Sequence, residues 1–275
     1  MFLLYNGELI SEEDVKIPLS NRAFQYGDGF FETILLEKGQ VRLWAEHWAR
    51  IEEAAAALYL SLPAGLSERE LPQQILALAQ QNQCTDLARV KFKIWRAGEG
   101  LYTPQTDTTE WLLTAQPTSP LAQTPLRVGI CRTVHTIPSR FSSFKGINSP
   151  VYVLASREKM KRGLDDLILL DTKDNLAELT SSNLFWMKGN VLFSPSLETG
   201  CVHGVMRRHL LQWAAENNWE VREGLFTLEE LQEAEALMAG NVTGLRIIEC
   251  VEDQILPSAT AAARQLVEQI NLTLV

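Results

Sequence analysis

The sequence predicts an α+β protein of two domains, and three features indicate it. Residues 89–95 alternate strictly between polar and apolar side chains, which is typical of a β-strand with one face in water. Apolar residues recur at helical spacing over residues 44–58, which predicts an amphipathic helix. Prolines, serines and threonines between residues 117 and 125 then interrupt the regular patterns. We therefore predict a smaller α/β domain over residues 1–118 and a larger mixed domain over residues 119–275.

Turn and capping signals place the remaining elements of the first domain. Asn6-Gly7 predicts a hairpin turn, because both residues tolerate positive φ. Ser67 followed by Glu70 forms a capping box, which predicts that a helix starts at Ser67. In chain order we expect a hairpin at 2–10, a second at 30–43, helices at 44–58 and from 67, and strands at 89–95 and 111–115.

The second domain is expected to begin with a strand at 126–131 and a helix from about Val151. Basic residues followed by Gly163 predict where that helix ends. Thr227 with Glu230 predicts the start of a later helix. The other expected elements are a strand at 167–170, a hairpin at 183–193, a helix at 205–217, strands at 237–239 and 245–251, and a closing helix at 258–271.

Composition narrows the classes of function. The chain has 275 residues, of which 46% are hydrophobic and 21% charged, as in ordinary globular proteins. Its net charge of -9 argues against nucleic acid or an anionic membrane as a partner, since both need basic patches. Four scattered cysteines favour buried thiols in a reducing cytoplasm, and we expect no signal peptide or membrane span. The histidines and cysteines show no zinc-like spacing, so no metal site is expected.

Lys145 is the first candidate for chemistry. It lies in the segment 140–148 among Phe, Ser and Gly residues, between a predicted strand and a predicted helix, with no other charge for four residues on either side. Partial desolvation lowers the pKa of a lysine and keeps part of it as the free amine that Schiff-base chemistry requires. The alternative is an ordinary solvated loop lysine.

Three further stretches could bind an anion. Two glycines at the entrance of the helix over residues 200–207 leave backbone N–H groups at Val205 and Met206 for a phosphate, or form a plain turn. The segment 240–244 could close the other side of such a site, or be a turn at a strand end. Arg50 could be a surface residue or a bidentate phosphate ligand.

Two more residues have a functional and a structural interpretation. Glu178 enters a strand expected to be buried, so its carboxylate needs a cationic or hydrogen-bonding partner, such as a protonated ring nitrogen, unless it lies at the rim. Tyr26 precedes Gly27-Asp28-Gly29, a turn that leaves its hydroxyl at a strand end. The chain contains no G-x-S-x-G motif, no P-loop and no dinucleotide-binding glycine motif, so hydrolase, NTPase and Rossmann functions lack support.

Together these stretches resemble the class IV aminotransferase family, the fold-type IV enzymes that use pyridoxal 5'-phosphate (PLP). The resemblance spans nearly the whole chain and is carried by Asn6-Gly7, residues 26–33, His47 to Arg50, the Lys145 loop, Glu178 with residues 183–185, and residues 199–207. It implies a small α/β domain, a larger pseudo-barrel domain that carries the PLP lysine, a cofactor cleft between them, and a homodimer. The residues it assigns are Lys145 as the attachment to PLP, Glu178 on the pyridine nitrogen, and Arg50, Val205, Met206, Asn241 and Val242 at the phosphate.

Within the family, residues 183–190 and 194–200 and the asparagine after Gly240 look most similar to the 4-amino-4-deoxychorismate lyases. Branched-chain aminotransferases usually carry Gly-Thr-Ala at that last place. D-amino acid aminotransferases carry an Arg-x-His pair shortly after the strand ending near Arg96, and this chain lacks it. Two departures from the lyases are Glu32, where some of them have a threonine implicated in proton transfer, and Ser149-Pro150, which replaces a tyrosine-containing turn.

The resemblance therefore implies a PLP-dependent lyase that converts 4-amino-4-deoxychorismate, a small-molecule substrate, to 4-aminobenzoate and pyruvate in folate synthesis. Lys145 and Glu178 would be its catalytic residues. Tyr26, Arg96 and Arg140 are the candidates for contacts to the substrate. One alternative is an aminotransferase for branched-chain or D-amino acids. A more remote one is a non-catalytic binding protein on the same fold.

Overall fold

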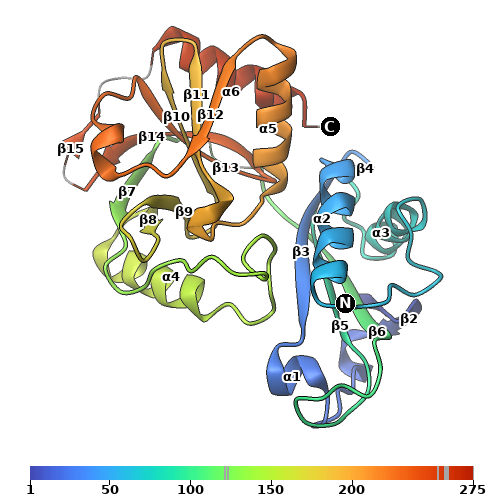
Figure 1. Cartoon of the computed structure of the whole chain (residues 1–275). Coiled ribbons are helices and arrows are strands. Elements are labelled where there is room, and N and C mark those ends of the chain that lie inside the picture. The colour runs from blue at the N-terminus through green and yellow to red at the C-terminus, as the bar shows by residue number, and fades with distance from the viewer. Residues whose placement is uncertain (121, 123, 253, 257–259, 275) are drawn as a thin grey trace. The chain divides into compact units, whose positions relative to one another are not determined.

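The computed structural model describes residues 1–275 except 121, 123, 253, 257–259 and 275. Its contacts divide the chain into two units (Figure 1). Unit 1 contains Met1–Pro120 together with Phe144–Asn148, and unit 2 contains Leu121–Ser143 and Ser149–Leu274. The prediction that the larger domain carries Lys145 is therefore wrong. The lysine segment returns to unit 1, where it pairs with a strand of that unit's sheet.

Unit 1 contains a six-stranded antiparallel sheet in the order β2-β1-β6-β5-β3-β4. Its strands are β1 (Phe2–Tyr5), β2 (Glu8–Ser11), β3 (Gly29–Glu37), β4 (Gln40–Val41), β5 (Leu87–Arg96) and β6 (Thr109–Pro117). The predicted first hairpin is confirmed: Asn6 and Gly7 have φ of 51° and 88°, which the tight turn requires. The alternation seen in the sequence is also confirmed, since β5 turns Val90, Phe92 and Ile94 inward.

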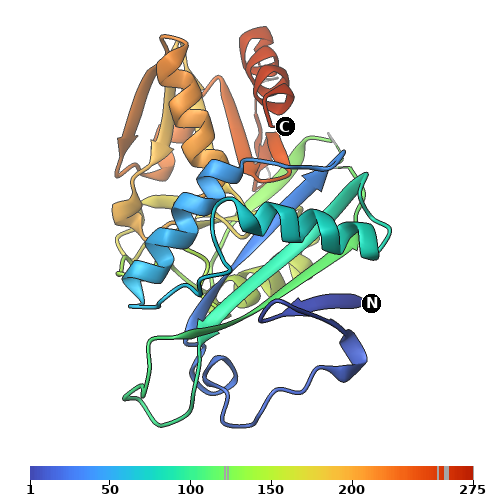
Figure 2. The same cartoon turned by 90° about the vertical axis from the view of Figure 1, so that its right-hand side faces the viewer.

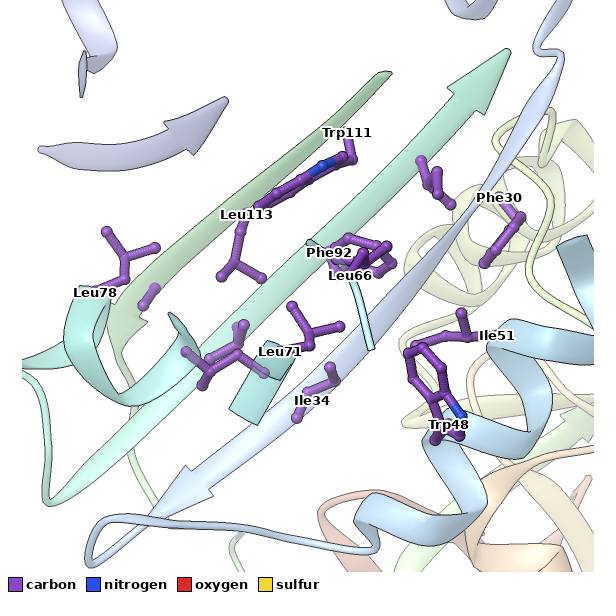
Figure 3. Packing of buried hydrophobic residues seen from close by; sticks show 14 of the residues in the cluster. Phe30, Ile34, Trp48, Ile51, Leu66, Leu71, Leu78, Phe92, Trp111 and Leu113 are labelled. Carbon is purple, nitrogen blue, oxygen red and sulfur yellow. The ribbon is translucent and has the colours of Figure 1, made fainter. Parts of the chain in front are cut away.

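Helices cover one face of this sheet, as Figure 2 shows for α2 and α3. The helices of unit 1 are α1 (Arg22–Tyr26), α2 (Trp44–Ala57) and α3 (Glu70–Gln81), with a 3₁₀ turn η1 (Glu12–Asp14). Ile51 of α2 and Leu71 of α3 pack with Phe30, Ile34 and Phe92 of the strands in one core (Figure 3). Each such burial stabilises the fold by about 1.5–3 kcal/mol. This core makes β3 and α2 a rigid support for the polar residues that they carry.

The helix predicted to start at Ser67 begins three residues later, at Glu70. Ser67 Oγ accepts a hydrogen bond from Glu70 N at 3.2 Å and donates to Glu70 Oε2 at 2.7 Å. The capping-box pair is thus present, but Ser67 belongs to the turn before the helix. The two residue types therefore predicted the Ser67–Glu70 contact correctly but placed the start of the helix three residues too early.

Unit 2 contains a nine-stranded mixed sheet, part of which closes on itself. The ring runs β10-β13-β14-β7-β8-β9 and returns to β10 through the pair Asn183–Glu178. The strands are β7 (Leu126–Ile130), β8 (Asp166–Leu170), β9 (Leu176–Leu179), β10 (Asn183–Lys188), β11 (Val191–Pro195), β12 (Glu220–Gly224), β13 (Ala236–Asn241), β14 (Gly244–Val251) and β15 (Gln254–Ile255). This closed ring confirms the expected pseudo-barrel, and its closure places Glu178 opposite the start of β10.

Three helices pack around this sheet: α4 (Pro150–Arg162), α5 (Val205–Glu216) and α6 (Ala261–Leu272). The helix α5 packs against β12 and β13, and α6 packs against β14 (Figure 1). Gly163 ends α4 with φ of 64°, as predicted. Short 3₁₀ turns occur at η2 (Leu197–Thr199) and η3 (Leu228–Leu231).

Two predicted helices of unit 2 differ from the structure. The predicted helix after Thr227 is only the 3₁₀ turn η3. The Thr227 side chain forms no capping hydrogen bond to the backbone of that turn. The predicted start of the last helix, Ser258, lies outside the described residues. Within the described part of the chain, no helix is long and apolar enough to span a membrane. All four cysteines are buried free thiols.

Candidate functional site

The Lys145 segment is held by the beginning of β3, within unit 1. Phe31 N donates to Lys145 O at 2.8 Å, and Ile147 N donates to Gly29 O at 3.1 Å. At the same point Gly29 lets β3 lie close to β5, because a Cβ there would lie 2.3 Å from Ile94 O on that strand. Phe144 is buried edge-on against Phe30 at a centroid distance of 6.0 Å. The lysine therefore has a backbone fixed as in a strand and a side chain that is half-buried.

A buried carboxylate lies directly after this pairing. Glu32 of β3 accepts hydrogen bonds from Arg50 Nε at 2.7 Å and Arg50 Nη2 at 2.5 Å, and His47 Nδ1 approaches its Oε2 at 2.7 Å. His47 and Arg50 are three residues apart on α2, so both side chains reach the same side of the helix. All three side chains are at most 1% exposed.

Burial and pairing set the protonation states of this cluster. Burial opposes the charge of Glu32, but the Arg50 guanidinium and the His47 hydrogen bond hold the pKa of its carboxyl well below the ordinary value. Burial lowers the pKa of His47 against the pull of Glu32, and the nearby charges of Arg50 and Lys145 lower it further. A neutral His47 must donate from Nδ1 to the carboxylate, which leaves Nε2 as an acceptor. Among the described residues, His47 Nε2 has no hydrogen-bond partner although it is buried.

The surface interpretation of Arg50 is wrong, because Arg50 is 1% exposed and paired with Glu32 in both of these hydrogen bonds. Its role toward a phosphate stays a prediction. Sequence reasoning recognised Glu32 only as a departure from the lyases and His47 only as part of a motif. Their contact joins residues 15 apart in the sequence, and the signal that could have found it is a charged residue inside a predicted apolar strand.

Unit 2 also contains a buried carboxylate, that of Glu178. It is 3% exposed on β9, so the rim interpretation is wrong. Tyr152 Oη donates to Glu178 Oε1 at 2.6 Å, and Val202 N donates to Glu178 Oε2 at 3.1 Å. Asn183, the cross-strand neighbour of Glu178, donates from Nδ2 to Val202 O at 2.8 Å. The carboxylate is therefore tied to α4 and to the loop before α5.

Within unit 2, the predicted anion-binding segments 200–207 and 240–244 lie close together around the start of α5. Gly204 is the N-cap of α5 and provides no side-chain cap, so Val205 and Met206 occupy the first positions of an uncapped helix N-terminus. A Cβ at Gly204 would lie 2.0 Å from Asn183 Oδ1, and a Cβ at Gly240 would lie 2.9 Å from Met206 Cγ. The start of α5 thus packs closely against the ends of β10 and β13. Met206 lies near Gly240, which directly precedes Asn241 and Val242.

The side chain of Asn241 is used within its own turn. It accepts hydrogen bonds from Thr243 N at 2.8 Å and from Thr243 Oγ1 at 2.6 Å. It also donates from Nδ2 to Ser181 O at 3.1 Å and to Ser182 Oγ at 3.0 Å. Asn241 therefore shapes the loop with its side chain, which leaves its backbone for any contact of Asn241 with an anion.

Arg96 is held by hydrogen bonds within unit 1. It is buried in unit 1, where it donates to Asp28 at 3.0 Å, to Asp107 at 2.5 Å and to a backbone carbonyl of residue 58 at 2.6 Å. These acceptors engage all three guanidinium nitrogens, and the predicted contact of Arg96 with the substrate stays a prediction. Tyr26 lies at the end of α1, half-buried, with its ring against Arg22 and its hydroxyl 3.5 Å from Gly100 O. Arg140 is exposed on unit 2.

Tyr152 was missed altogether by sequence reasoning. It is the third residue of α4 and lies 26 positions before Glu178. Burial, followed by the charge and the hydrogen bond of Glu178, raises the pKa of Tyr152 far above the ordinary value, so the hydroxyl keeps its proton. No local pattern marks a tyrosine in a first helical turn as the donor to a carboxylate on a distant strand.

Comparison with known proteins identifies the family. Residues 29–250 match the model of the family described as "Amino-transferase class IV". The chain belongs to the class IV aminotransferase family. A relative named aminodeoxychorismate lyase, from Vibrio harveyi, is 31% identical over 83% of this chain and 85% of its own.

Other class IV aminotransferase relatives have different names. A putative branched-chain-amino-acid aminotransferase from Methanocaldococcus jannaschii is 29% identical over 86% of this chain and 83% of its own. Among solved structures, the 4-amino-4-deoxychorismate lyase from Pseudomonas aeruginosa superposes with a TM-score of 0.86 at 26% identity, over 99% of both chains. The class IV aminotransferase fold is thus shown, while the names of the relatives divide between lyase and aminotransferase.

Each unit, taken by itself, contains residues of the kinds that PLP, the cofactor of the class IV aminotransferase family, requires. Unit 1 supplies a lysine beside a buried, charge-paired cluster whose His47 Nε2 has no partner among the described side chains. Unit 2 supplies a buried carboxylate for a ring nitrogen and an uncapped helix N-terminus for a phosphate. Within the described residues, no cluster of three His, Cys, Asp or Glu side chains could hold a metal ion.

Proposed function

We propose that this class IV enzyme binds PLP and is a lyase that converts 4-amino-4-deoxychorismate to 4-aminobenzoate and pyruvate. The observation that carries the proposal is the buried Glu178 carboxylate, oriented by Tyr152 and Val202, beside the uncapped start of α5. This arrangement suits the ring and the phosphate of PLP. The choice of lyase is supported by the 31% identity to the Vibrio harveyi lyase and by the lyase-like residues 183–190 and 194–200.

Each cofactor-binding residue has a role that follows from its surroundings. Lys145 would attach to the cofactor through Nζ, and Glu178 would accept the ring N–H. The N–H groups of Val205 and Met206 would hold the phosphate, helped by the backbone of Asn241 and Val242. Arg50 would add positive charge, held in place by Glu32. When bound, PLP supplies an electron sink for the charge that develops on the reacting carbon.

The protein's own part in the reaction is a proton transfer at Lys145. In its unprotonated form, Lys145 Nζ would take the proton from the ring carbon that bears the substrate's amine. The bond from the ring to the enolpyruvyl oxygen then breaks with its electron pair, and the ring becomes aromatic. The released enolpyruvate takes up a proton and becomes pyruvate. No oxidant or amino acceptor is needed, because substrate and products have the same atoms.

Aminotransferase activity is the second candidate. The branched-chain relative at 29% identity supports it, as does Glu32 at the position where some lyases have a threonine. In this chain Glu32 is committed to His47 and Arg50, which leaves proton transfer to Lys145. A homodimer in the cytoplasm, as the resemblance and the composition imply, belongs to either candidate.

The two candidates differ in their need for a second substrate. A lyase supplied with 4-amino-4-deoxychorismate alone should release pyruvate and 4-aminobenzoate over many turnovers. An aminotransferase stops after one half-reaction unless a keto acid is added. We expect continuous pyruvate formation without an acceptor, measured with a coupled lactate dehydrogenase assay. Lys145→Ala is the inactive control. Rapid transamination of leucine or D-alanine, with no pyruvate from the chorismate derivative, would reverse the assignment.

A further inference from the structure

Tyr152 makes a short hydrogen bond to one oxygen of Glu178, within unit 2. The distance from Tyr152 Oη to Glu178 Oε1 is 2.6 Å, while the other carboxylate oxygen receives Val202 N at 3.1 Å. The two oxygens of Glu178 are therefore held from two elements, α4 and the loop that leads into α5. A carboxylate fixed at both oxygens has lost the rotation about its last side-chain bond.

Tyr152 itself is well supported. It stands in the first turn of α4, which begins with Pro150 at its N-terminus, where the fixed φ of proline suits a helix. Its ring packs against a small core cluster that contains Ala155, Leu167 and Leu169. The hydroxyl is thus placed by a rigid helix start and by apolar packing, and not by a mobile loop.

In the hydrogen bond between Tyr152 and Glu178, the tyrosine is the donor. Burial, with the carboxylate second, raises the pKa of Tyr152 so that the phenol stays protonated. A protonated phenol beside a carboxylate donates its hydrogen. Donation to a buried carboxylate stabilises its anionic form, and a hydrogen bond to a charged group is about twice as strong as one between neutral groups. The neighbouring Cys201 thiol stays protonated, because burial followed by the charge of Glu178 raises its pKa to about 12, and it donates to Ser196 O.

We propose that Tyr152 is a positioning residue that keeps Glu178 anionic and oriented toward the ring nitrogen of bound PLP. This inference rests on the proposed function, because it assigns Glu178 to that nitrogen. It gives α4 a role beyond packing: the helix carries the donor that sets the carboxylate. The competing interpretation is that the hydrogen bond only ties α4 to β9.

The experiment measures PLP affinity of the apo protein, which does not depend on turnover. Tyr152→Phe removes the hydroxyl and keeps the ring. Tyr5→Phe is the matched control: Tyr5 Oη also donates to a carboxylate, Glu110 Oε2, at 3.1 Å, but it lies on β1 of unit 1. Each variant is titrated with PLP and with 1-deaza-PLP, in which a C–H replaces the ring nitrogen, and the quenching of tryptophan fluorescence is followed.

We expect Tyr152→Phe to weaken PLP binding by about tenfold or more, because Glu178 without this donor is less well oriented and less stabilised as the anion that accepts the ring N–H. The same variant should change the affinity for 1-deaza-PLP less than about twofold, because Glu178 has no ring N–H to accept there. In the Glu178→Gln background, Tyr152→Phe should likewise add little. Tyr5→Phe should leave both affinities unchanged while lowering the melting temperature about as much as Tyr152→Phe.

Equal losses with PLP and 1-deaza-PLP, or an affinity equal to that of Tyr5→Phe, would overturn the positioning role and leave the proposed function intact. A wild-type protein that binds neither ligand would instead overturn the proposed function. If Tyr152→Phe does not fold, Tyr152→Met provides the same comparison with a flexible apolar side chain.

Discussion

Glu32→Gln tests whether the buried cluster of Glu32, His47 and Arg50 supports unit 1. The substitution keeps the shape of the side chain and removes its charge. Arg50 would then remain 1% exposed without its carboxylate partner. Removing one partner of a buried ion pair destabilises a protein by about 3–5 kcal/mol, because the other charge stays buried. We therefore expect Glu32→Gln to lower the free energy of unfolding by that amount.

The same strand offers a matched control. Glu37 of β3 pairs with Arg42, but the two side chains are 23% and 15% exposed. Both side chains are half-buried but reached by water, which screens the pair and lowers its contribution toward the about 0–1 kcal/mol of solvent-exposed pairs. Glu37→Gln should therefore cost less than about 1 kcal/mol, although both substitutions remove one carboxylate from an Arg–Glu pair. Urea denaturation of the apo proteins, followed by circular dichroism, measures both.

The difference in unfolding free energy between wild type and Glu32→Gln should depend on pH in a defined direction. The folded pKa of Glu32 lies below its unfolded value, so its stabilisation is complete above about pH 4.3 and is lost as the pH falls. The pKa of His47 is also lowered in the folded state. Below about pH 6.5 the unfolded chain therefore takes up a proton at His47 more readily than the folded one, and the free energy of unfolding falls. The gap between wild type and Glu32→Gln should be full at pH 7 and shrink below about pH 4.

Equal destabilisation by Glu32→Gln and Glu37→Gln would refute this reasoning. It would mean that water reaches Arg50 and solvates its charge. A gap that stays constant down to pH 3 would equally refute the assignment of a charged Glu32.

Two further predictions concern Lys145 and the start of α5. Borohydride treatment of the PLP-loaded protein should fix the cofactor to the peptide that contains Lys145, as peptide mass spectrometry would show; a label on Lys91 or Lys93 would contradict the assignment. Gly204→Ala should weaken PLP binding at least about tenfold, because its Cβ would lie 2.0 Å from Asn183 Oδ1 and displace the helix start. Gly65→Ala, where nothing lies within 4 Å of the added Cβ, is the control, and equal affinities in the two variants would count against an anion site at α5.

The sequence by itself determined features that depend on a few neighbouring residues. The hairpin at Asn6-Gly7, the alternation of β5 and the end of α4 at Gly163 were predicted correctly. In each case the deciding quantity is local: a positive φ, a period of two, or a left-handed helix end. The resemblance in motif order likewise indicated the family, because the spacing of motifs along a chain survives without any knowledge of contacts.

Only the tertiary structure decided the partners of the buried polar groups. The segment with Lys145 pairs with β3, more than 100 residues earlier, which moved the lysine from the predicted second domain to unit 1. Arg96, a candidate for contact with the substrate, is buried with a hydrogen bond to Asp28, and Tyr152 is the donor to Glu178. A buried charge must find a partner wherever the fold supplies one. That partner usually comes from a distant segment of the chain, so local propensity and periodicity do not predict it. The packing of strands and helices determines which segment supplies it.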